Sequence, residues 1–264
     1  MTHPLDGAHA KVARARENLK ELDRKSVAFV QAHPYVVAPE IDPQTGQLVG
    51  ILRAQVKEDP IPLELGVIAG EVGHNLRSAL NYLTLCLAEP PIGTGAGDST
   101  QFPIFYDPPG STYKKPARQR FREGENKYLY GVRPVHRTLI EKAQPYNGRH
   151  REHLAFLAVL NNGDKHRLPT PTGILGHIEP PDLGDYHGKM LAHINRTPAV
   201  HDGAEVFRVV GAAFDGDAAQ VHMKFDPAYE IGFGDNPMIG TTNTMWRAAH
   251  FVELVLRVFH RVFV

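Results

Sequence analysis

The sequence predicts an α+β fold in a single domain, with helices packed against antiparallel β-hairpins. The chain has 264 residues, of which 42% are hydrophobic and 22% charged, as in globular proteins with a sizeable core. Segments with helical and with alternating periodicity occur in separate blocks, whereas a doubly wound sheet would alternate them. No segment rich in Gly, Ser or charge divides the chain, so we expect one domain over residues 1–264.

The first part of the chain predicts a long helix, a hairpin and a second long helix. Apolar residues recur at helical spacing over 8–31, and Pro34 ends that pattern. Extended runs at 35–41 and 47–57 flank the turn sequence DPQTG, which favours a β-hairpin. The second helix is predicted over 63–88, because its apolar residues fall on one side and prolines precede and follow it.

The middle of the chain predicts a long loop followed by further helices. Residues 89–115 are rich in Pro and Gly, and we expect the apolar sequence QFPIFY within them to anchor on the core. Residues 115–130 are mostly polar, and their pattern fits neither the helical nor the strand periodicity. Helices are predicted at 134–144 and 149–165, so the helical part of the domain runs roughly from residue 63 to 166.

The last part of the chain predicts strands and a final helix. EVFRVVGAAF and QVHMKF flank DGDA and predict a second hairpin, and EIGFG adds a strand, which makes a β-rich part over roughly 168–235. The final helix is predicted over 241–263, with Thr241 or Thr242 as its N-cap. We expect its apolar face to dock on this fold or on a second copy of the chain, which would make a homodimer.

Charge, cysteine content and hydropathy exclude several classes of protein. Lys plus Arg and Asp plus Glu number 29 each, so there is no strong nucleic-acid signal and no attraction to an anionic membrane. The single cysteine, Cys86, cannot form an internal disulfide and excludes a zinc site of several thiolates within one chain. No membrane span or signal-sequence core is recognisable, which predicts a cytoplasmic protein. The GxSxG, HExxH and CxxC signatures are absent.

The helix predicted around HNLRSALN carries a polar stripe of low charge. His74, Arg77, Ser78 and Asn81 lie three or four residues apart, so they are neighbours on the side opposite the apolar face. A solvated helix face usually carries Lys and Glu, which this stripe lacks apart from one glutamate at its edge. We expect another segment to cover the stripe, with Gly73 allowing a close approach, because an unpaired buried polar group costs about 1–3 kcal/mol.

A second polar segment, NNGDKHR at 161–167, ends a later predicted helix and is the expected partner of the stripe. Asp164 could form a charge-assisted, bidentate pair with Arg77. His166 could face His74. These pairings would bring the two motifs to one place in the fold.

The candidate site therefore comprises His74, Arg77, Asn81, Asp164 and His166. Two histidines, a carboxylate and amide groups can ligate a divalent metal. The same set could run general acid–base chemistry, with Arg77 stabilising a developing anion, as in a hydrolase or nuclease. Two alternatives stay open: a structural network that holds two helices in register in a non-enzymatic binding or self-associating protein, or a solvated face without a role. The spacing selects no single chemistry and no substrate.

HNLRSALN and LNNGDKHR, with TQFPIF between them, resemble a widespread family of uncharacterised bacterial and phage-borne proteins. That family commonly has HNLRSALD and N..DKHR at these places, and the resemblance covers most of residues 63–264. This chain departs from the pattern at Asn81, where the family has Asp, which removes one carboxylate that could ligate a metal or act as a base. The resemblance implies no particular activity.

A looser analogy is with the HEPN helical nucleases, in which paired helices carry Arg, Asn and His. Their signature places His a few residues after Arg. Arg247 with His250 and Arg257 with His260 lie closer together than in that signature. The likeness therefore implies no nuclease activity, because a shared fold type does not carry function.

Overall fold

Helices and two small antiparallel sheets make up the computed structural model, so the predicted α+β class is confirmed. The structure describes residues 3–56, 60–89, 99–108, 110–148, 151–164, 169–175, 191–194, 200–210, 229–235 and 238–263.

The chain divides into two compact units that are each built from segments distant in sequence. Unit 1 comprises Met1–Asp23, Leu63–Thr170 and Phe233–Val264, and unit 2 comprises Arg24–Pro62 and Pro171–Gly232. Unit 2 thus contains both most of the predicted β-rich part at 168–235 and the hairpin near the N-terminus. That the chain forms one domain stays a prediction.

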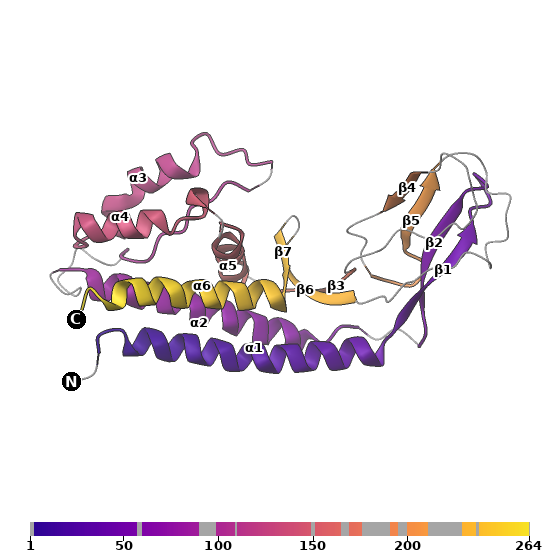
Figure 1. Ribbon diagram of the computed structural model, residues 1–264, viewed down its shortest axis with the longest axis horizontal. Coiled ribbons are helices and arrows are strands. Elements are labelled where there is room, and N and C mark those ends of the chain that lie inside the picture. The colour runs from indigo at the N-terminus through magenta and orange to yellow at the C-terminus, as the bar shows by residue number, and fades with distance from the viewer. Residues whose placement is uncertain are drawn as a thin grey trace. The chain divides into compact units, whose positions relative to one another are not determined.

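Unit 1 is helical and contains the first part of α1. Figure 1 labels its helices, which are α1 (Asp6–Ala32), α2 (Leu63–Leu87), α3 (Ala117–Tyr128), α4 (Pro134–Lys142), α5 (Arg151–Asp164) and α6 (Thr242–His260), with a short 3-10 turn at Pro145–Asn147. The helices predicted from periodicity are confirmed within a few residues. The ambiguous polar segment at 115–130 forms α3, which buries only Ala117 and Phe121. So small a buried face explains why the apolar pattern there is weak.

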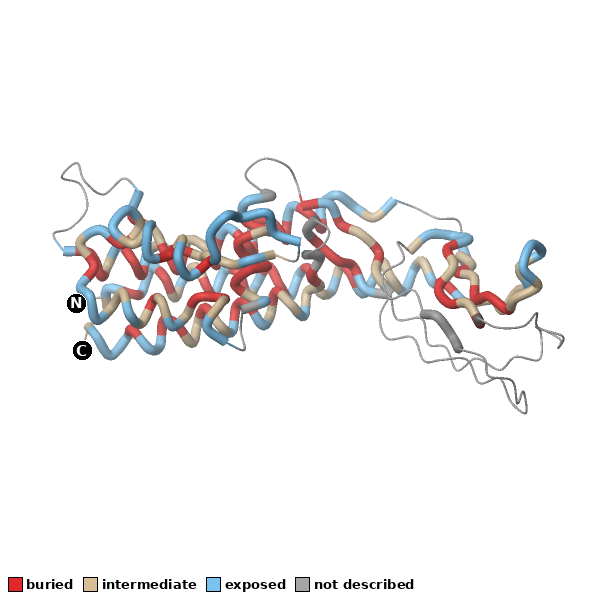
Figure 2. Tube along the Cα trace, turned by 90° about the horizontal axis from the view of Figure 1, so that it is seen from above, coloured by how far each residue is buried: buried red, intermediate tan, exposed pale blue. Residues whose placement is uncertain are grey.

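The core of unit 1 forms where α2, α5 and α6 pack against one another. Buried residues recur along these helices and alternate with exposed ones, as Figure 2 shows. The final helix docks within this unit, as one of the two predicted alternatives requires, because Met245, Val252 and Phe259 on its apolar face are almost fully buried. Thr241 occupies the N-cap position, but its side chain makes no capping hydrogen bond.

Unit 2 contains a four-stranded antiparallel sheet of order β1-β2-β5-β4. Its strands are β1 (Tyr35–Ile41), β2 (Leu48–Ala54), β4 (Leu191–Ile194) and β5 (Glu205–Val210). The predicted first hairpin is confirmed, with Tyr35 opposite Ala54 and Ile41 opposite Leu48. Gly50 is required where β2 meets β5, because a Cβ there would lie 2.0 Å from the ring of Phe207.

The second sheet has the order β3-β6-β7, with strands at Pro171–Leu175, Tyr229–Asp235 and Met238–Thr241. The strand predicted at EIGFG is confirmed as part of β6. Only part of the predicted second hairpin can be compared, because the segment QVHMKF lies outside the described residues. Its first strand, EVFRVV, is β5, which pairs with β2 and β4.

The turn of the first hairpin is held by a single arginine from β5. Arg208 donates hydrogen bonds to Asp42, at 2.6 Å, and to Thr45 and Gln47, and it also pairs with Glu205. The Arg208 guanidinium, with the Gln44 backbone N–H and the Thr45 hydroxyl, lowers the pKa of Asp42 from 3.8 to about 2.

We predict that this turn loses part of its stability only in strong acid. Because the pKa of Asp42 is lower in the fold than in the unfolded chain, its contribution is complete above pH 3.8 and is lost as the pH falls through about 2. NMR titration of the Asp42 carboxyl measures the midpoint, and Asp42→Asn provides the control in which this acid dependence disappears. A midpoint near 3.8 would show that Arg208 does not hold the carboxylate.

Candidate functional site

The predicted polar stripe lies on α2 and runs from solvent on one side to a covered edge on the other. His74 is exposed, whereas Arg77, Ser78 and Asn81 are half-buried. The expectation that another segment covers the whole stripe is therefore wrong at His74. Successive residues turn by 100° around a helix, so the four residues of the stripe spread over a wide part of the helix surface. One edge of that surface can therefore face water while the other edge packs against a neighbouring segment.

The covered edge of the stripe faces α5, and a glycine makes this possible. A Cβ at Gly73 would lie 3.1 Å from the Leu160 side chain and 3.7 Å from the backbone nitrogen of Asn161. Asn161 itself is buried, with 4% of its surface exposed. At this point α2 packs against α5, beside the first residue of the second motif, whereas the predicted pairing of the two motifs' side chains stays a prediction. Arg77 lies one turn after Gly73, on the same side of α2.

Arg77 is half-buried as a residue, but one nitrogen of its guanidinium is fully buried and lacks a partner in the described part of the chain. Its Nη1 atom is buried and makes no hydrogen bond. Burial lowers the pKa of Arg77 to about 10, and removal from water is the cause. Arg16 and Arg133 of unit 1, in contrast, pair with carboxylates, although the Nε atom of Arg16 is also buried without a hydrogen-bond partner among the described residues.

The predicted partners from the second motif are only partly described. Asp164 is the last residue of α5, and its side chain lies outside what the structure describes. His166 also falls outside the described residues. The pairing of Asp164 with Arg77 and that of His166 with His74 therefore stay predictions.

Asn81 holds the segment that follows α2. Its Oδ1 accepts a hydrogen bond from the backbone N–H of Phe102, at 3.1 Å, and the Phe102 side chain is fully buried. The prediction that QFPIFY anchors on the core is confirmed. An aspartate at position 81 offers an oxygen at the same place, so the departure from the family pattern keeps this contact.

Gln144 completes the anchoring of the same segment and is a residue that the sequence did not single out. Its Oε1 accepts from the N–H of Phe105 at 3.0 Å, and its Nε2 donates to the carbonyl of Pro103 at 2.8 Å. A single buried glutamine after a helix has no recognisable pattern, because its partners lie about forty residues away in sequence and are backbone groups.

At the exposed edge, the Ser78 hydroxyl lies 3.5 Å from Nε2 of His74. Within the residues that the structure describes, no group of three or more His, Cys, Asp and Glu side chains is placed to hold a metal ion. Metal ligation by His74 would therefore need side chains such as those of Asp164 and His166.

Comparison of the chain with protein-family models, curated proteins and solved structures returned no match. None of the described helices is long and apolar enough to cross a membrane. The geometry of α2 and its neighbours is thus the basis for a functional proposal.

We predict that position 81 needs a side-chain oxygen rather than an amide. Asn81→Ala should lower the free energy of unfolding by about 1–2 kcal/mol, because the Phe102 N–H loses its acceptor. Asn81→Asp should retain most of the stability, since a carboxylate oxygen can accept the same bond. Urea denaturation measures both variants, and equal losses in the two would exclude this role for Asn81.

Proposed function

We propose that unit 1 binds a phosphate-type oxyanion at the polar stripe of α2, and that the chain acts on a small phosphate-bearing molecule. The observation that supports this most directly is the Nη1 atom of Arg77, which is buried without a hydrogen-bond partner among the residues that the structure describes. A guanidinium presents several N–H donors in a planar fork that matches phosphate and carboxylate oxygens.

The cost of this arrangement favours a ligand over a structural role. Removing a cation from water destabilises a fold unless another group compensates for the charge. No carboxylate among the described residues compensates for Arg77, and the lowered pKa follows from burial. Groups that destabilise the free protein are typical of binding and active sites, where the ligand supplies the missing interaction.

The neighbours of Arg77 favour phosphate over carboxylate as the bound group. The exposed His74 and the half-buried Ser78 lie on the adjoining part of α2 and add an imidazole and a hydroxyl to the guanidinium. Several donors on one face suit a tetrahedral group with three or four oxygens better than a carboxylate with two. The equal numbers of acidic and basic residues argue against a long nucleic acid, whose binding depends on many phosphate contacts.

A hydrolytic reaction on a phosphoester is the chemistry that this arrangement suits. Arg77 would neutralise charge that develops on the non-bridging oxygens, as guanidinium groups do in phosphoryl transfer. The exposed imidazole of His74 would move the proton to or from the reacting oxygen. Asp164 and His166, if α5 and the residues after it bring them here, would orient that imidazole or the attacking water.

The alternative function is a non-enzymatic binding or self-associating protein in which these polar groups are structural. The hydrogen bond from Phe102 to Asn81 and the two bonds of Gln144 to the same segment favour it. A homodimer would have to use exposed residues such as Val258 on α6, since the apolar face of that helix is buried. Light scattering over a range of concentrations measures this self-association.

We predict that Arg77→Met leaves the free energy of unfolding unchanged or raises it by up to about 2 kcal/mol, because the apolar side chain keeps the packing and removes the buried charge. Arg14→Met is the matched control, since Arg14 is exposed and pairs with Glu17. It should change stability by no more than about 0.5 kcal/mol. A loss of more than about 1 kcal/mol in Arg77→Met would support the structural alternative.

We also predict saturable binding of inorganic pyrophosphate to the intact chain, measured by isothermal titration calorimetry. Arg77→Met should weaken it at least about tenfold, which corresponds to the loss of about 1.4 kcal/mol. Arg14→Met should bind like the parent chain, and acetate should compete poorly. Equal pyrophosphate affinity in Arg77→Met and the parent would exclude an oxyanion site at Arg77.

His74 separates binding from chemistry. In His74→Gln we expect pyrophosphate affinity to stay within a few fold, because Arg77 supplies the main contact. Hydrolysis of bis-p-nitrophenyl phosphate should fall about a hundredfold, as expected for the loss of general acid–base catalysis. Undiminished hydrolysis in this variant, or no hydrolysis by the parent chain, would contradict the proposed hydrolase activity. The proposal of oxyanion binding would then stand alone.

A further inference from the structure

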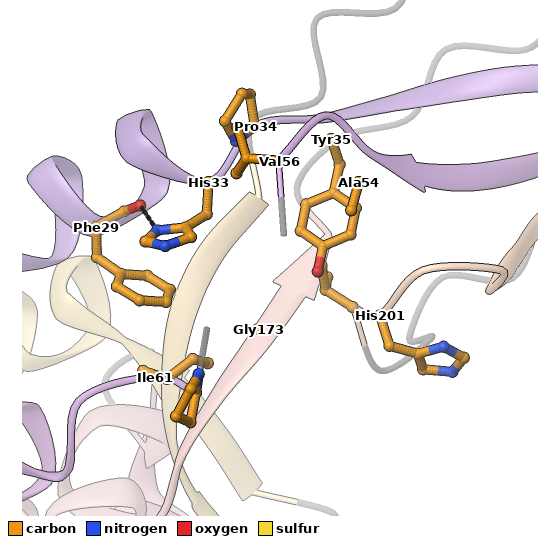
Figure 3. Close-up of a pocket in the computed structure, with 11 residues that line it drawn as sticks. Phe29, His33, Pro34, Tyr35, Ala54, Val56, Ile61, Gly173 and His201 are labelled. Carbon is orange, nitrogen blue, oxygen red and sulfur yellow. Dashed lines mark hydrogen bonds between the residues drawn. The ribbon is translucent and has the colours of Figure 1, made fainter. Parts of the chain in front are cut away.

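Unit 2 contains a cavity of about 380 Å³, distinct from the stripe on α2. Its walls come from the end of α1, the beginning of β1, the end of β2 and the segments around Ile61 and Val200. Figure 3 shows these side chains around the cavity. Phe29 of α1 and His33, which follows that helix, lie on one side, and Tyr35 and Ala54 lie on another.

The lining of the cavity is aromatic and aliphatic. The rings of Phe29 and His33 stack with centroids 4.3 Å apart and an angle of 25° between their planes. Tyr35 is buried, and Ile61 and Val200 add aliphatic surface. Among the described residues that line the cavity, none is Lys, Arg, Asp or Glu. These described lining residues therefore favour an uncharged ligand, because an ion would leave water without a carboxylate, ammonium or guanidinium group among them to pair with.

The His33 imidazole has a defined orientation. Its Nδ1 lies 2.9 Å from the carbonyl oxygen of Phe29. A carbonyl oxygen only accepts, so Nδ1 carries a proton in this contact. The stack on Phe29 and this bond fix the ring plane. The ring of His201, in contrast, points away from the other lining side chains (Figure 3).

A close backbone contact holds the far wall of the cavity. The Val200 N–H donates to the carbonyl of Gly173 at 3.3 Å. A Cβ at Gly173 would lie 2.8 Å from the Cβ of Val200, so only glycine lets β3 and this segment come so close. The cavity is therefore formed by fixed elements on both sides, as ligand sites usually are before the ligand arrives.

We propose that this cavity binds a small, uncharged molecule with one or two fused rings. The volume lies near the lower limit for small-molecule sites, which begins at about 300 Å³, and so excludes large cofactors. Ring stacking and apolar contact with Phe29, Tyr35 and Ile61 supply the attraction, and the fixed imidazole of His33 orients the ligand. The site is independent of the oxyanion proposal for unit 1.

The test uses the full chain and indole as the probe, with indole-3-acetate as its charged counterpart. Ligand-observed NMR and isothermal titration calorimetry measure affinity for both. Ala54→Leu should fill the cavity and weaken indole binding at least about tenfold. The matched control is Ala38→Leu, because Ala38 lies on β1 in the same hairpin and does not line the cavity.

Indole binding by the parent chain and by Ala38→Leu, together with its loss in Ala54→Leu and weaker binding of indole-3-acetate, supports the proposal. If Ala54→Leu does not fold by circular dichroism, Ile61→Trp fills the cavity from another wall and replaces it. Absence of indole binding up to its solubility limit overturns the proposal. Equal indole affinity in the cavity-filling variant and the parent chain also overturns it, as does equal affinity of the parent chain for indole and indole-3-acetate.

Discussion

The contact between α2 and α5 at Gly73 determines how the candidate site of unit 1 is built. Because Gly73 has no side chain, the two helices approach closely. A Cβ at this position would lie only 3.1 Å from the side chain of Leu160. α6 packs against both helices and completes the core around this contact. The approach covers one edge of the polar stripe and leaves the other in water. Arg77 lies one turn after Gly73 on the covered side and is half-buried, whereas His74 is exposed.

Periodicity predicted the elements of the fold because each helix and the first hairpin depend on residues close in sequence. α2 is the clearest case, since its apolar side repeats at helical spacing and prolines flank it. The pairing of β5 with β2 could not be predicted, because strand pairs far apart in sequence leave no local signal. The grouping of Arg24–Pro62 with Pro171–Gly232 in unit 2 follows from that non-local pairing.

The burial of the polar stripe was predicted in part for the same reason, and the site itself stays a prediction. Low charge on one side of α2 indicated cover, and this is correct for Arg77 and wrong for His74. The partner of Asn81 could not be found from the sequence, because it is a backbone N–H twenty-one residues further on and any residue type can supply one. The cavity of unit 2 combines five separate segments of the chain, and none of them carries a recognisable motif.

Arg77 and Asn81 lie one turn apart on α2, and the contrast between them bears on function. Asn81 has its oxygen bonded to Phe102, and this contact explains an oxygen-bearing side chain there without any ligand. Within the described part of the chain, Arg77 has a buried nitrogen without such a bond, and burial has lowered its pKa. A network that only holds helices in register would be more stable with an apolar side chain at position 77. This contrast supports the proposal that an anion compensates for the cation, and the two candidates for that anion are a bound ligand and the Asp164 carboxylate predicted from the sequence.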